Sequence, residues 1–140
     1  MSSMSEDFMR VLQEQHAEYQ GMWNKKVRVP MLTLDTLIEN YGMPNYVKID
    51  VEGFEEHVLD GLSSQPPLLS FEFNLAYLDA AFRCLDKLVF SPTSAFNFVF
   101  GENAKFEFTE WIGQKDELKR HLGKMKTIDT NGDVFVRKGV

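Results

Sequence analysis

The sequence YVKIDVEGFEEHVLDGL, from Tyr46 to Leu62, joins a strand pattern directly to a helix pattern. Its first part alternates apolar residues in steps of two, and its second part spaces them along one face of a helix. A strand that leads at once into a helix is typical of α/β proteins, in which ligands bind beyond the carboxyl ends of the strands. Four carboxylates stand at this join: Asp50, Glu52, Glu55 and Glu56.

Outward from this stretch, helix and strand patterns alternate along the chain. Residues 95–111 are predicted to form a hairpin, and Asn131-Gly132 is predicted to be a turn. The alternation predicts an α/β fold with a partly parallel sheet. Helices are expected at 5–21, 33–42, 53–61, 74–90 and 114–125, and strands at 26–32, 46–51, 68–73, 96–100, 106–108 and 134–136.

Composition sets limits on the class of protein. The 140 residues are enough for one domain with its own core. A net charge of -6 disfavours a nucleic-acid partner, which needs clustered Lys and Arg, and no apolar run is long enough to span a membrane. The single cysteine, Cys84, lies in an apolar helical pattern, so we expect a buried thiol in a reducing compartment and a cytoplasmic protein.

The carboxylates at the join allow two interpretations. In the first, Lys48 and Asp50, which lie on the same side of the strand, form a local ion pair, and the acidic residues that follow favour the helix N-terminus. In the second, the carboxylates serve a ligand. A second apolar strand carries Glu72 in the same late position, between Phe71 and Phe73. We therefore expect Asp50 and Glu72 to converge on one crevice.

Several of these elements together resemble a known family. The "TLDTLI" helix start, the "KIDVEGFE" turn, the "VLDGL" helix end and the Glu72 strand occur in this order within about residues 29–75. This arrangement resembles the FkbM-type methyltransferases, which use S-adenosylmethionine. The resemblance implies a three-layer, Rossmann-like methyltransferase sheet, here incomplete. Residues 46–51 would be its fourth strand and residues 68–73 its fifth. The hairpin-like strands and the strand at 134–136 would complete the far edge, with its reversed last strand.

The resemblance also implies roles for individual residues. Asp50, Glu52 and Glu72 would be catalytic, with Asp50 orienting the acceptor or acting as the base, and the acceptor would be a small molecule with a hydroxyl group. No residues are assigned to S-adenosylmethionine, and no metal site is predicted, although carboxylate and amide oxygens suit magnesium. A solvated helix histidine is the other interpretation of His57. The remaining substrate contacts would come from Asn74, Lys48 and His57.

The chain departs from the family pattern before residue 27. A complete enzyme of this kind has an earlier half with a glycine-rich turn that approaches the cofactor. Residues 1–26 contain one helix pattern and one glycine, Gly21. We therefore expect residues 1–26 to form an N-terminal helix and residues 27–140 to form the C-terminal half of a methyltransferase domain.

Half of such a sheet would leave the edge of the strand at 46–51 uncovered. Two remedies are expected: the N-terminal helix, Phe8 to Tyr19, covers the sheet, or a second copy or another chain pairs with it. Three functions follow from the sequence. The chain is an O-methyltransferase whose cofactor half comes from another chain, a non-catalytic α/β interaction module derived from that family, or a truncated fragment.

Overall fold

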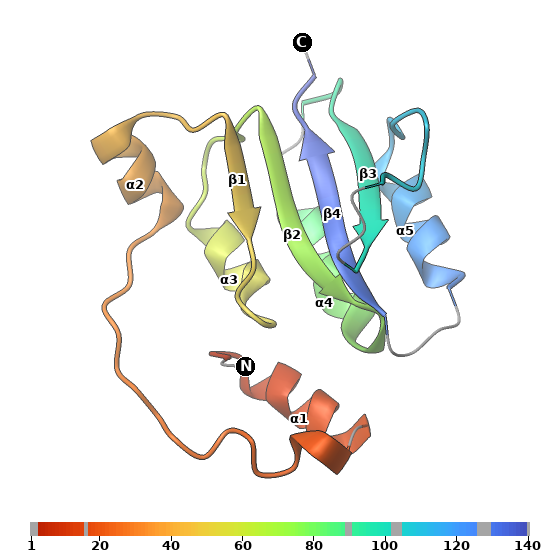
Figure 1. Ribbon diagram of the computed structural model, residues 1–140. Coiled ribbons are helices and arrows are strands. Elements are labelled where there is room, and N and C mark those ends of the chain that lie inside the picture. The colour runs from red at the N-terminus through yellow and green to blue at the C-terminus, as the bar shows by residue number, and fades with distance from the viewer. Residues whose placement is uncertain (1–2, 16, 89–90, 102–104, 126–129, 140) are drawn as a thin grey trace.

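The computed structural model describes residues 3–15, 17–88, 91–101, 105–125 and 130–139 (Figure 1). Helices and strands alternate as the sequence predicts. The helices are α1 (Glu6–Gln15), α2 (Leu34–Tyr41), α3 (Glu55–Asp60), α4 (Leu78–Lys87) and α5 (Lys115–Gly123), with short 3-10 turns η1 (Ala17–Tyr19) and η2 (Leu75–Tyr77). The strands are β1 (Tyr46–Ile49), β2 (Leu68–Asn74), β3 (Ala95–Phe100) and β4 (Asn131–Arg137).

The four strands form one mixed sheet in the order β1-β2-β4-β3. β1 and β2 are parallel, and β4 is antiparallel to both of its neighbours, β2 and β3. The last strand of the chain is therefore reversed and lies between β2 and β3. The predicted α/β class is confirmed, and the arrangement is that of part of a Rossmann-like methyltransferase sheet.

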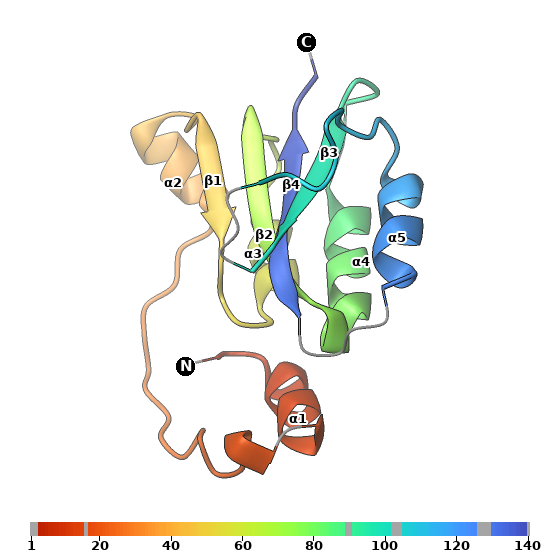
Figure 2. The ribbon, with the colours of Figure 1, turned by 45° about the vertical axis from the view of Figure 1, so that its right-hand side comes forward.

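Helices α3, α4 and α5 pack on one face of the sheet (Figure 2). The alternate residues of β2 that face them, Leu69 and Phe71, are fully buried, and so are Val134 and Val136 of β4. Each such side chain contributes about 1.5–3 kcal/mol through removal from water. The polar residues that alternate with them along β2 lie on the opposite face of the sheet. β2 therefore contributes core residues to one face and candidate site residues to the other.

The predicted strand at 26–32 is wrong. Residues 22–33 form neither helix nor strand, and this segment, here called the strap, runs beside the sheet from α1 towards α2 (Figure 1). Val27 and Val29 are 70% and 55% exposed. An alternating apolar pattern makes a strand only where a neighbour completes its hydrogen bonds, and Pro30 has no N–H to give.

The predicted hairpin at 95–111 is wrong in its second half. β3 forms, but residues 105–112 do not form a paired strand: they contact β3 through an isolated bridge between Phe96 and Ile112 and a hydrogen bond from Glu107 N to Phe98 O at 3.0 Å. The buried Asn97 side chain takes the place of a ladder: its Nδ2 donates to Phe108 O at 2.8 Å, and its Oδ1 accepts from Phe108 N at 3.2 Å. A side chain that bonds a neighbouring backbone offers an alternative to strand pairing.

The predicted turn at Asn131-Gly132 is also wrong, because both residues belong to β4. Gly132 pairs with Phe73 on one side and Phe100 on the other. A Cβ atom at this position would lie 2.1 Å from the carbonyl oxygen of Val99. The glycine therefore serves close packing inside a central strand and not a turn.

Candidate functional site

The parallel strands β1 and β2 end at the same edge of the sheet, as the sequence predicts. Asp50 and Glu52 follow β1, and Glu72 and Asn74 are the last polar residues of β2. α1 lies just beyond these strand ends (Figure 1). The expected N-terminal helix therefore covers the carboxyl ends of the strands, and the free edge of β1 is left uncovered by it.

The turn between β1 and α3 is held by Glu55. One carboxylate oxygen of Glu55, Oε1, accepts hydrogen bonds from Val51 N at 3.1 Å and from Gly53 N at 3.2 Å. Glu52 and Gly53 both have positive φ, 53° and 88°, a conformation that costs a residue other than glycine free energy and persists only when its surroundings fix it. Glu55 is buried, and that burial raises its pKa although the two backbone donors lower it.

The sequence analysis assigned Glu55 only to the helix N-terminus and missed this second role. A glutamate two residues after a glycine, at a strand-to-helix join, is the signal that could have found it. Glu52 is partly buried in the same turn. Burial is the largest cause of a raised pKa at Glu52, and the neighbouring charges of Asp50 and Glu55 raise it further.

Glu72 is the most perturbed carboxyl group of the strand-end region. The pKa of Glu72 is raised to about 7, chiefly by burial. A hydrogen bond from Asn131 lowers this pKa, whereas the carboxylates of Glu52, Asp50 and Glu55 raise it. Asn131 Nδ2 donates to Glu72 Oε1 at 3.0 Å. A carboxyl group with a pKa near neutrality, at a strand end and beside a cavity, is a candidate acid or base.

Lys48 and Asp50 form the ion pair that the first interpretation predicts, with Nζ and Oδ2 3.4 Å apart. The lysine also reaches Asp133 of β4 at 3.4 Å. Burial lowers the pKa of Lys48, and Asp133 and Asp50 together outweigh it, so the pKa is raised. The side chains of Lys48 and Asp50 are 47% and 50% exposed, so this pair lies at the wet edge of the site. The sequence analysis missed Asp133, which lies directly opposite Glu72 in the strand register.

The other two predicted contact residues have local partners. Asn74 Oδ1 accepts a hydrogen bond from Ala76 N at 2.8 Å and so caps η2. His57 is exposed, with its ring against Phe54 and its Nδ1 3.7 Å from Asp60. Asn74 therefore acts as a helix cap, and His57 has the contacts of a solvated histidine on a helix surface.

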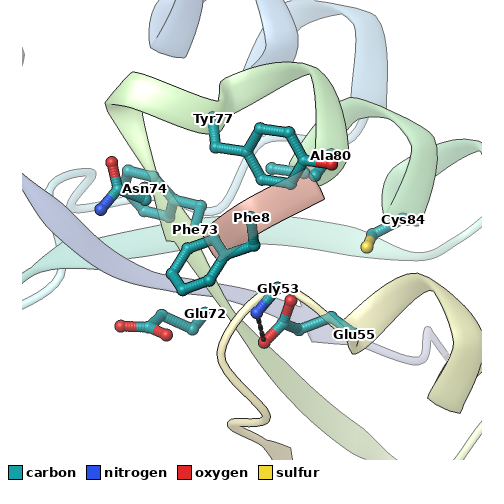
Figure 3. A pocket seen from close by; sticks show the side chains of 10 residues that line it. Phe8, Gly53, Glu55, Glu72, Phe73, Asn74, Tyr77, Ala80 and Cys84 are labelled. Carbon is teal, nitrogen blue, oxygen red and sulfur yellow. Dashed lines mark hydrogen bonds between the residues drawn. The ribbon is translucent and has the colours of Figure 1, made fainter. Parts of the chain in front are cut away.

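A crevice lies between the strand ends and the start of α4, and Phe8 of α1 fills it (Figure 3). The Phe8 ring is 6.0 Å from the Tyr77 ring, and a Cβ atom at Gly53 would lie 2.3 Å from that of Phe8. A void of about 20 Å³ remains, which is room for about one water molecule. We call this space the strand-end crevice; its lining includes Phe8, Gly53, Glu55, Glu72, Asn74 and Cys84.

A larger opening, of about 420 Å³, lies between α1, the start of α3 and the first half of α4. We call it the polar groove. Its charged groups are paired with one another: Arg83 Nε donates to Glu56 at 2.7 Å, and Arg10 donates to Asp7 at 2.9 Å. The hydrogen bond from Arg83 lowers the pKa of Glu56. The groove is lined by Ser5, Asp7, Arg10, Glu56, His57 and Arg83, together with residues that it shares with the strand-end crevice.

S-adenosylmethionine does not fit the strand-end crevice in this arrangement. The cofactor is a nucleoside that carries an amino-acid chain, and the void beside Phe8 holds about one water molecule. β1 is the end strand of the sheet, so no described strand supplies a glycine-rich turn on its free side.

The described ranges of the chain contain no group of three His, Cys, Asp or Glu residues placed to hold a metal ion. They also contain no helix with the length and apolar character needed to cross a membrane.

Comparison with known proteins agrees with the arrangement of the fold. The family model described as the methyltransferase FkbM domain matches residues 3–119, which is more than half of the chain. No curated protein and no solved structure matches. The match takes in α1, the strand-to-helix turn and both strands that end at the crevice. The chain belongs to the FkbM methyltransferase domain family.

Proposed function

We propose that this chain forms the acceptor side of a methyl transfer from S-adenosylmethionine to a hydroxyl oxygen, with Glu72 as the group that accepts the hydroxyl proton. The observation that carries the proposal is the Glu72 carboxyl, which has a pKa of about 7 because it is partly buried at a strand end among other carboxylates. A base is most effective when its pKa is near the working pH. S-adenosylmethionine, when bound, supplies the methyl group.

The other carboxylates have distinct parts in this proposal. Glu55 fixes the turn that carries Glu52, and the negative charges of both keep the pKa of Glu72 high. Asp50, in its half-exposed pair with Lys48, stays a prediction as the group that orients the acceptor. The proposal includes a cytoplasmic location, because Cys84, the one cysteine of the sequence, is a buried free thiol that suits a reducing compartment.

The role of Glu72 is tested by the Glu72→Gln variant, which keeps the size of the side chain and an oxygen for Asn131. Transfer of a labelled methyl group to hydroxyl acceptors is expected to fall by about a hundredfold to ten-thousandfold. Glu110→Gln, on an exposed glutamate outside the site, is the control and should leave transfer unchanged. Undiminished transfer in Glu72→Gln would remove this residue from the mechanism.

A second candidate function, that of a non-catalytic interaction module, is favoured by apolar side chains beside the free edge of β1. Val27 and Leu32 of the strap are each 70% exposed, and Tyr41 of α2 is 84% exposed. The strap, α2 and β1, which carry these residues and the exposed Tyr46, lie along one side of the molecule (Figure 1). An uncovered strand edge with apolar neighbours is a surface that soluble proteins usually protect.

The occupant that we propose for this edge is a second copy of the chain, paired antiparallel along β1. If Ile49 lies on the two-fold axis, Lys48 of each copy stands opposite Asp50 of the other, whereas an axis at Lys48 would oppose two lysines. The charge pattern thus selects one register. The strap lies on the same side and would become part of the interface.

Both functions are distinguished by calorimetric titration with S-adenosylhomocysteine after sedimentation equilibrium has established the oligomeric state. Saturable binding to a dimer supports methyl transfer completed across two copies. A dimer that binds no ligand up to millimolar concentration supports the interaction module. Asp50→Lys should give a monomer, and Lys48→Asp combined with Asp50→Lys should restore the dimer; a wild type that stays monomeric contradicts the pairing.

A further inference from the structure

α1 contacts the rest of the molecule through one narrow face. Phe8 and Leu12, four residues apart and therefore on the same side of the helix, are 4% and 3% exposed. Phe8 enters the strand-end crevice beside Tyr77 (Figure 3). The Ser3 hydroxyl, just before the helix, donates to the carbonyl oxygen of Glu52. The buried contacts of α1 are thus concentrated at the site itself.

Gly53 packs against Phe8 and has no side chain that would collide with the Phe8 ring. Gly53 has φ 88°, and any Cβ atom there would overlap the Phe8 side chain. The backbone of the turn therefore comes directly against the aromatic ring. The absent side chain leaves a space that Phe8 takes and that a ligand of similar thickness could take instead.

α1 lines two cavities that have a common wall. The void of about 20 Å³ beside Glu72 and the polar groove of about 420 Å³ are both lined by Gly53, Glu55, Tyr77 and Ala80. Phe8 closes the first, and Asp7 and Arg10 line the second. Without α1, the two spaces would join into one cavity that reaches from Arg83 to Glu72.

The segment that joins α1 to the sheet is compatible with α1 moving away from the crevice. The strap, residues 22–33, forms neither helix nor strand and leaves most of its apolar side chains exposed. The main contacts of α1 with other elements are with η1, on its own segment, and with η2, at the crevice. Segments with few buried contacts open at a lower free energy than the core does.

From these observations we propose that α1 is a displaceable plug: Phe8 occupies the position of the acceptor in the strand-end crevice, and the site accepts a ligand only after α1 has moved away. This proposal rests on the proposed function, because it regulates that same site.

Cys84 is a built-in reporter of this opening. It lines the strand-end crevice with Phe8, it is 1% exposed, and it is the one cysteine of the sequence. Its thiol borders the crevice on one side and the buried apolar core on the other, and burial raises its pKa to about 12, so a thiol reagent reacts slowly with it while the crevice is closed. Its labelling rate can be measured by mass spectrometry on the full chain, without cofactor or acceptor.

The test compares the labelling rate of Cys84 in wild type, Phe8→Ala and a control on the same helix, Met9→Ala, which leaves Phe8 and Leu12 in place. Phe8→Ala should raise the rate by about tenfold or more, since a side chain that contributes to closure is lost. Met9→Ala should label close to the wild-type rate. Low urea should change the rate little, because local opening exposes much less surface than global unfolding does.

A Phe8→Ala rate equal to that of wild type would overturn the proposal, and so would labelling that rises with urea as steeply as global unfolding does. If Phe8→Ala does not fold, Phe8→Leu, which keeps an apolar side chain in the crevice, takes its place with the same expected direction. The result is independent of methyl transfer. Failure of the plug therefore leaves the Glu72→Gln test standing, and failure of methyl transfer leaves the labelling result standing.

Discussion

The middle of the sheet and the strap beside its β1 edge have similar alternating apolar sequence and end in different surroundings. On one side, β2 and β4 pair with neighbours and bury Phe71 and Val134 completely. On the other, β1 ends the sheet, and the strap beside it leaves Val29 55% exposed. Alternating apolar residues therefore make a core only where backbone partners and helices are both present. We call these two parts the covered side and the open side.

The largest expected effect breaks the covered side. Phe71→Ala removes a fully buried ring between β2 and the helices, and it should lower the free energy of unfolding by about 3–5 kcal/mol. Val29→Ala, on the open side, should change it by no more than about 0.5 kcal/mol. Urea unfolding of both variants measures the difference, and equal losses would mean that the strap is buried in solution.

A smaller loss is expected at Asn97, which replaces a strand ladder on the covered side. Asn97→Ala leaves the N–H and the carbonyl oxygen of Phe108 without their side-chain partner, at a cost of about 1–3 kcal/mol. Asn24→Ala, on the exposed strap, is the matched control and should have little effect. A thermal melt of each variant would show the loss. An unchanged melting temperature for Asn97→Ala would mean that the flanking residues, and not these hydrogen bonds, hold the segment at Phe108 in place.

The pH dependence of stability tests Glu72, on the strand that pairs with β1. The pKa of Glu72 is about 7 in the folded chain against 4.5 for an ordinary glutamate, so folding favours the protonated form. Its contribution to stability is fully present below about pH 4.5 and is lost as the pH rises to about 7. Glu72→Gln should therefore gain stability relative to wild type between those pH values.

The measurement is urea unfolding of wild type and Glu72→Gln at pH 5 and pH 8, under the same ionic strength. Taking the difference between the two proteins cancels the other titrating groups that the variant leaves unchanged. A difference that is the same at both pH values would show that the Glu72 carboxyl titrates as it does in the unfolded chain.

The smallest effect is expected on the open side, at Asp50. Asp50→Asn weakens an ion pair whose side chains are about half exposed, so the loss of stability should be roughly 1 kcal/mol or less. Methyl transfer should be abolished in the same variant if Asp50 orients the acceptor. Calorimetric melting and the transfer assay together check both parts, and unchanged turnover would remove Asp50 from the mechanism.

The site was predictable where a single segment carries the signal. The helix start at Thr33, whose side chain accepts from Thr36 N, follows from local residue types, and so does the join between β1 and α3. The convergence of Asp50 and Glu72 follows from parallel strands that end at one edge. Asn131 and Asp133, by contrast, reach the site only through the antiparallel pairing of β4 with β2, and nothing near them in the sequence indicates this.

The sequence by itself determined the α/β order, the family and the carboxylates at the strand ends, because these depend on local patterns and on their order along the chain. The tertiary structure alone decided which apolar segments become strands, since Val27 and Val134 have similar neighbours and only one has a pairing partner. It also decided that Phe8 fills the strand-end crevice and that Glu72 has a pKa of about 7. Burial and neighbouring charge come from segments far apart in the chain, and no local pattern contains them.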